Sequence, residues 1–142
     1  MIKLPIRIGS DLGERIAKSY AEAIRQVGEA EELYVRSKLP KVLASLTRGP
    51  QDWRSEVAFM ASAIFEAYEN PDHMSTANGN SRPMLLAALF YLCNPYDIIP
   101  DRVPSTGFVD DAVVLNDCLQ RIEQEDPELS REILASIEKS RR

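Results

Sequence analysis

The sequence predicts an all-α fold, a compact bundle of five to six helices around one buried central helix. Apolar residues recur every three or four positions along several segments, which is the spacing of one helix face. Residues 84–93 form an unbroken apolar run, and a helix that is apolar on every face is buried. Strand-like alternation stays within four residues, apart from a short stretch at residues 4–8. These observations favour a helical bundle with residues 84–93 at its centre.

The first helix is expected to begin at Ser10 and Asp11, because a serine followed by acidic residues is typical of a helix start. Its apolar stripe continues for about 25 residues beyond that start. Pro40 removes a backbone donor and should kink or break this helix near Lys38. A short second helix should then follow and end before Pro50.

The remaining helices are delimited by similar signals. A third helix is expected over residues 52–69, and residues 70–81 should form a mobile surface loop. Ser81 and Pro83 mark the start of the central helix, because proline is tolerated in a first turn. Further helices are expected over residues 108–125 and 128–140, and the whole chain of 142 residues forms one domain.

Composition narrows the class of protein. The net charge of -5 argues against a nucleic-acid partner, because phosphate binding needs a basic surface. No signal peptide is visible, and the ten-residue apolar run is shorter than the about 20 residues that a spanning helix needs. Cys93 and Cys118 lie in apolar helical patterns and are predicted to be buried free thiols. We therefore expect a cytoplasmic protein of bacterial type.

Two of the helices are joined by an unusual turn within residues 94–111. Pro95, Pro100 and Pro104 make the turn stiff, and Gly107 suits a positive φ just before the next helix. The same stretch is rich in aspartate, and its acidic residues are Asp97, Asp101, Asp110 and Asp111. This turn is the candidate functional site of the chain.

Helical spacing suggests how the four aspartates are arranged. Asp97 and Asp101 are four residues apart, Asp111 belongs to the buried stripe of the following helix, and Asp110 belongs to a more solvated face. Converging carboxylates need compensation. Backbone N–H groups can cap them, Arg82 or Arg102 can pair with one, or Mg²⁺ or Ca²⁺ can bind Asp97, Asp101 and Asp111 with Asp110 beside them. All three explanations remain open.

The string YLCNPYDIIPDRVPSTGFVDDAVVL resembles the signature of the YkvA-like family, a domain of unknown function (DUF1232). The resemblance covers about residues 84–122 and rests on eleven positions with fixed spacing. These positions are Tyr91, Leu92, Pro95, Asp97, Ile99, Pro100, Asp101, Pro104, Gly107, Asp110 and Asp111. It implies a helical hairpin and brings no established activity.

Some relatives in that family look membrane-linked and carry a more apolar version of this segment. The present chain departs from them with polar residues at five positions: Arg102, Ser105, Thr106, Asn116 and Asp117. These departures and the acidic charge disfavour membrane-surface association, which stays the second alternative.

The function favoured by the residues is a non-enzymatic protein-interaction or regulatory module. His73 is the single histidine and lies in the expected loop, so no catalytic triad is predicted and no catalytic residue is assigned. The partner surface is expected on the N-terminal helices, where a homodimer is plausible. The first alternative is a divalent-metal domain, with Mg²⁺ or Ca²⁺ on the Asp cluster and hydrolytic chemistry.

Overall fold

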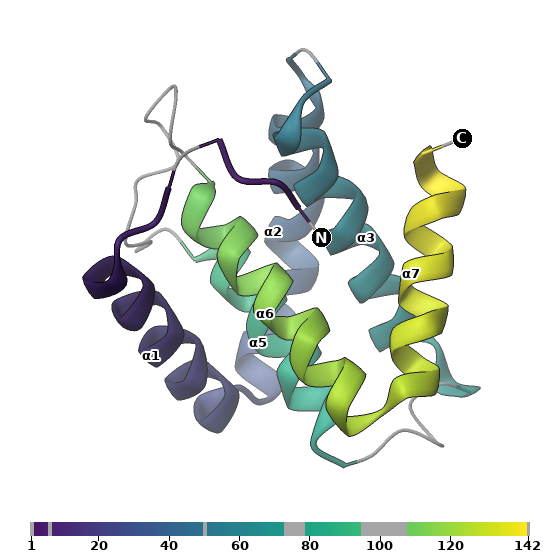
Figure 1. The fold of residues 1–142 in the computed structure, drawn as a ribbon. Helices are drawn as coiled ribbons and strands as arrows, with labels where there is room; N and C mark the ends of the chain where they lie inside the picture. The colour runs from purple at the N-terminus through teal and green to yellow at the C-terminus, as the bar shows by residue number, and fades with distance from the viewer. Residues whose placement is uncertain (1, 6, 50, 73–78, 95–107, 142) are drawn as a thin grey trace.

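The computed structural model describes residues 2–5, 7–49, 51–72, 79–94 and 108–141. Six helices account for most of them, and they pack against one another as a bundle (Figure 1). The prediction of an all-α bundle is confirmed. The helices are α1 (Ser10–Gln26), α2 (Glu29–Thr47), α3 (Trp53–Glu69), α5 (Ser81–Cys93), α6 (Val109–Glu125) and α7 (Pro127–Arg141).

The helix α5 is the centre of the bundle. It contacts α1, α2, α3 and α6, and in Figure 1 it lies behind α6. Leu85, Leu89 and Leu92 share one face of the helix and are at most 1% exposed, and Ala87 and Ala88 on its other sides are equally buried. Burial of each leucine side chain contributes roughly 1.5–3 kcal/mol. The predicted buried central helix is therefore confirmed.

The first two helices differ from the sequence prediction. One long helix breaking near Lys38 was expected, but α1 ends at Gln26 and α2 begins at Glu29. Gly28 lies between them in an extended conformation, and its backbone N–H donates to Glu31 Oε1 at 2.9 Å. Glycine loses more conformational freedom in a helix than other residues, so the helix breaks here and Glu31 caps the new start.

Pro40 lies inside α2 and does not end it. Its side chain is exposed, while Leu39 and Leu46 anchor the other side of the helix in the core. A proline ring costs a helix one backbone hydrogen bond. The buried leucines on both sides of Pro40 hold α2 together in spite of that loss.

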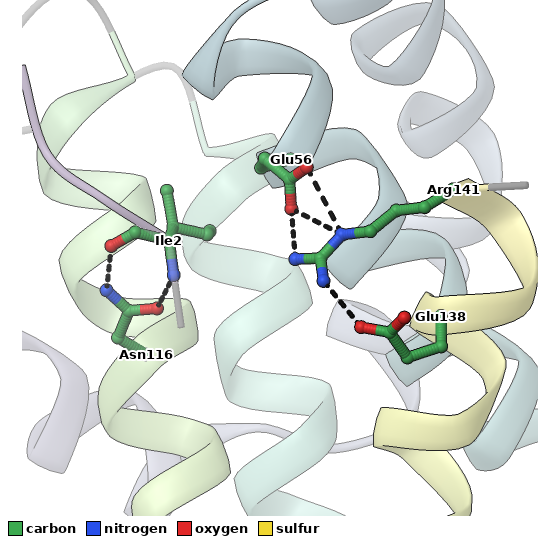
Figure 2. A network of polar contacts seen from close by, with 5 residues as sticks. All are labelled: Ile2, Glu56, Asn116, Glu138 and Arg141. Carbon is green, nitrogen blue, oxygen red and sulfur yellow. Dashed lines mark hydrogen bonds and ion pairs between the residues drawn. The ribbon is translucent and has the colours of Figure 1, made fainter.

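The pair of helices α3 and α7 forms one side of the bundle. Each has an aspartate cap: Asp52 accepts from the backbone N–H of Arg54 at 2.9 Å, and Asp126 accepts from that of Leu129 at 3.2 Å. Near the C-terminus, Arg141 pairs with Glu56 of α3 and, at 2.8 Å, with Glu138 (Figure 2).

The N-terminal arm crosses the bundle and is fixed to α6. The Ile2 N–H donates to Asn116 Oδ1 at 2.9 Å, and Asn116 Nδ2 donates to the Ile2 carbonyl oxygen at 3.0 Å (Figure 2). The Ile2 side chain is buried in the core. One side chain therefore satisfies both backbone groups of Ile2, as a neighbouring strand would.

Candidate functional site

The described part of the candidate site lies where α5 ends and α6 begins. Tyr91 is in the last turn of α5, and its hydroxyl donates to Asp110 Oδ2 at 3.0 Å. Both residues are buried. This contact joins the two helices that flank the turn.

Two carboxylates are buried side by side in the first turn of α6. Asp110 is 0% exposed and Asp111 is 1% exposed, between the buried side chains of Val109 and Ala112. Negative charge in the first turn of a helix is favoured by about 0.3–1 kcal/mol at the surface, and by up to about 2 kcal/mol when partly buried. The start of α6 is thus a place where the fold holds two acids out of solvent.

The sequence prediction is right for Asp111 and wrong for Asp110. Asp111 was placed on the buried stripe of the helix, and it is buried. Asp110 was placed on a more solvated face, but Tyr91 of α5 covers it. Spacing along one helix shows which residues share a face, whereas the burial of that face depends on the neighbouring helices.

The backbone just before α6 is unusual. Phe108 has a φ of 72°, the left-handed region, and it is the one non-glycine residue with positive φ among those described. A side chain in this region costs roughly 1–2 kcal/mol. A positive φ was expected at the preceding residue, Gly107. Gly107 lies outside the described residues, as do Pro95, Pro100 and Pro104. Asp97, Asp101, His73 and half of the predicted loop at 70–81, residues 73–78, also lie outside them.

A second polar group lies under the start of α5. The Tyr20 hydroxyl donates to the Met84 carbonyl oxygen at 2.9 Å, and Cys118 Sγ donates to the same oxygen at 3.6 Å. Burial raises the pKa of the Cys118 thiol to about 12. Burial, followed by the nearby Cys118, raises the pKa of Tyr20 above its ordinary value. The sequence placed Cys118 in an apolar helical pattern and did not predict this shared acceptor.

The predicted state of the two cysteines is confirmed. Cys93 and Cys118 are both buried free thiols. In the described ranges, no group of three or more His, Cys, Asp or Glu side chains is arranged to hold a metal ion. Of the four predicted acids, the described part of the candidate site contains two, Asp110 and Asp111.

The fold and the site define a class: an all-α bundle in which a central helix and the next helix enclose a pair of acids at their junction. Residues 81–116 match the model of a family described as a protein of unknown function (DUF1232). The match covers α5, the turn and the first half of α6, so the suspected resemblance is confirmed as a partial segment. No curated protein and no solved structure matches the chain.

Within the described residues, no helix is both long enough and apolar enough to cross a bilayer.

Proposed function

We propose that this protein is a non-enzymatic interaction module that binds a second copy of itself through the outer face of α2. This outer face is the stripe of residues opposite the core. Its members are spaced three and four residues apart, and all are exposed: Ala30, Leu33, Ser37, Pro40, Ala44 and Thr47.

The observation that carries the proposal is Leu33, which is 61% exposed within an uncharged stripe. The solvent-facing side of a surface helix is ordinarily charged or polar. Within the described residues, Leu134 on α7, at 44%, is the other exposed large hydrophobic side chain. Covering a leucine in a contact removes apolar surface from water and contributes roughly 1.5–3 kcal/mol.

The outer face is complementary to itself in an antiparallel pair. A twofold axis midway between positions 37 and 40 would place Leu33 opposite Ala44 of the partner copy. The same axis would place Ser37 opposite Pro40 and Ala30 opposite Thr47. Each pair then contains at least one small residue, which allows two helices to approach to about 8–10 Å. Such a twofold contact is the commonest form of protein self-association.

The charges along α2 also favour an antiparallel partner. Its first turn is acidic, with Glu29, Glu31 and Glu32, whereas the exposed cation Arg48 follows its last residue. The same twofold axis would place Glu29 of one copy opposite Arg48 of the other. Charge complementarity of this kind adds to specificity and to the rate of association.

Sedimentation of the purified protein over a wide concentration range tests the proposal. We expect a reversible monomer–dimer equilibrium for the natural sequence, a monomer for Leu33→Asp, and the natural equilibrium for Leu134→Asp. Both leucines are exposed, so neither change should alter folding by more than about 0.5 kcal/mol. A natural protein that stays monomeric, or a Leu33→Asp variant that still dimerises, overturns the proposal.

A divalent-metal function is a second candidate, favoured by the burial of the adjacent carboxylates of Asp110 and Asp111. In this account Asp97, Asp101 and Asp111 are ligands for Mg²⁺ or Ca²⁺, and Asp110 supports them. A thermal melt of metal-stripped protein with Mg²⁺, Ca²⁺ and Mn²⁺ tests it. An ion at 100 times its Kd adds about 2.7 kcal/mol of stability. The shift should vanish in Asp111→Asn, and no shift with any ion removes the metal function.

A further inference from the structure

A cavity of about 310 Å³ lies where α1, α2 and the last turn of α5 meet. This junction cavity includes the joint between α1 and α2 and is separate from the outer face of α2. Its size is at the lower end of the range for small-molecule sites. Its lining includes Glu22, Gln26, Glu31, Phe90, Tyr91 and Asn94.

The described residues that line the junction cavity give it negative charge. Glu22 and Glu31 are the two acidic side chains among these residues, and neither Lys nor Arg is among them. Glu31 Oε1 accepts the N–H of Gly28 at 2.9 Å, which fixes this carboxylate at the edge of α2. Acids that line a concave surface with low-dielectric walls focus a negative potential, and this attracts cations and repels anions.

The opposite wall of the junction cavity is aromatic and rigid. The Phe90 ring is held edge-on by Tyr34, with ring centroids 5.7 Å apart. Tyr34 is fixed in turn, because its hydroxyl donates to the Cys93 carbonyl oxygen at 3.3 Å. Tyr91 is held by its hydrogen bond to Asp110. A fixed aromatic wall offers an apolar surface to a short carbon chain and a negative ring face to a cation.

We propose that the junction cavity binds a small organic cation, an ammonium or guanidinium group on a short apolar chain. Glu22 and Glu31 serve as its counter-ions, the amide oxygens of Gln26 and Asn94 accept its N–H groups, and Phe90 contacts its carbon chain. A free amine and a Lys or Arg side chain of a partner share this chemistry. The proposal does not depend on self-association through α2.

The test is an NMR titration of the folded protein with butylammonium and butylguanidinium, and with neutral butanol and anionic butyrate as matched probes. The cations should shift the amide signals of Glu22, Gln26 and Phe90, whereas butanol and butyrate should not. Binding should weaken as salt is added, because an exposed carboxylate is screened.

Charge-neutral variants make the test specific. Glu22→Gln and Glu31→Gln should each weaken cation binding about twofold to fivefold, as expected for partly exposed ion pairs. Glutamine can still cap Gly28, so Glu31→Gln should fold normally. Glu14→Gln is the matched control, because it removes the same charge from an exposed position of α1 outside the cavity and should leave binding unchanged.

Two comparisons decide the result. Tighter binding of butylammonium than of acetylated lysine and arginine amides assigns the site to a free amine, and the reverse order assigns it to a side chain of a partner. The proposal is overturned if butanol binds as well as butylammonium, or if the double Glu22→Gln/Glu31→Gln variant binds as the natural protein does. It is also overturned if Mg²⁺ or Ca²⁺ displaces the organic cations and binds more tightly.

Discussion

The Tyr91 hydroxyl donates a buried hydrogen bond to Asp110 Oδ2 at 3.0 Å, and this bond closes the junction between α5 and α6. Both partners lie in the segment that matches the DUF1232 model. The two residues are nineteen positions apart, and the turn between them leads into a strained backbone at Phe108. The bond therefore connects the two helices directly, in addition to the stretch of chain that links them.

Removal of this hydroxyl should destabilise the fold. Tyr91→Phe leaves a buried carboxylate oxygen without its donor, so we expect a loss of about 1–3 kcal/mol in the free energy of unfolding. Urea unfolding measures the loss. The control is Tyr34→Phe, which removes a longer and partly exposed bond to the Cys93 carbonyl oxygen. Equal losses in the two variants would contradict the role given to Tyr91.

Asn116→Leu should release the N-terminal arm from α6. The change removes two hydrogen bonds to the backbone of Ile2, each contributing about 0.5–1.5 kcal/mol. Hydrogen exchange at the Ile2 amide should accelerate, and residues 1–9 should become sensitive to protease. Asn116→Asp keeps the acceptor for the Ile2 N–H and should protect the arm in part. An arm that stays protected in Asn116→Leu would refute this assignment.

Stability should fall at alkaline pH as Cys118 ionises. Burial raises its pKa from an ordinary 9.0 to about 12, so the folded state favours the neutral thiol. That contribution is complete below pH 9 and is lost as the pH rises from about 9 toward about 12. Urea unfolding at several pH values should show the decline, and Cys118→Ala should show a shallower one. If the free energy of unfolding fell equally steeply with pH in the two proteins, Cys118 would not be the cause of the decline.

Replacement of Pro40 should stabilise α2. Pro40→Ala restores a backbone donor and favours the helix by about 3 kcal/mol. The unfolded chain also becomes more flexible, which lowers the stability of the folded state by about 0.4–1 kcal/mol. We expect a net gain of about 2 kcal/mol, measured by thermal or urea unfolding. Pro40 is exposed, so no core contact is lost. A destabilised variant would mean that α2 needs its proline for another reason.

Much of the fold could be predicted because several signals agree at each helix. Asp52 and Asp126 cap helices whose apolar faces begin just after them, and the apolar run of α5 is buried as expected. The first break was misplaced because Pro40 has a strong local penalty and Gly28 a weaker one. Tertiary contacts of Leu39 and Leu46 outweigh the penalty at Pro40, and one sequence does not show those contacts.

The candidate site was predictable in part. Helical spacing placed Asp111 on the buried side of its helix, where the structure has it. The burial of Asp110 depends on a tyrosine of another helix, and the bond between Asn116 and Ile2 spans 114 positions. Such contacts follow from packing between distant segments, and the periodicity of one helix does not predict them.

Disulfide trapping tests the proposed α2 contact most directly. Cysteines at position 37 of two antiparallel copies would lie about 4.5 Å apart along the helix axis, within reach of a disulfide. Cysteines at position 45, an exposed control on the same helix, would lie about 20 Å apart along it. The two native thiols are buried. The account predicts that mild oxidation converts Ser37→Cys to a covalent dimer and leaves Ser45→Cys monomeric. Equal cross-linking of both variants, or none in Ser37→Cys, would contradict it.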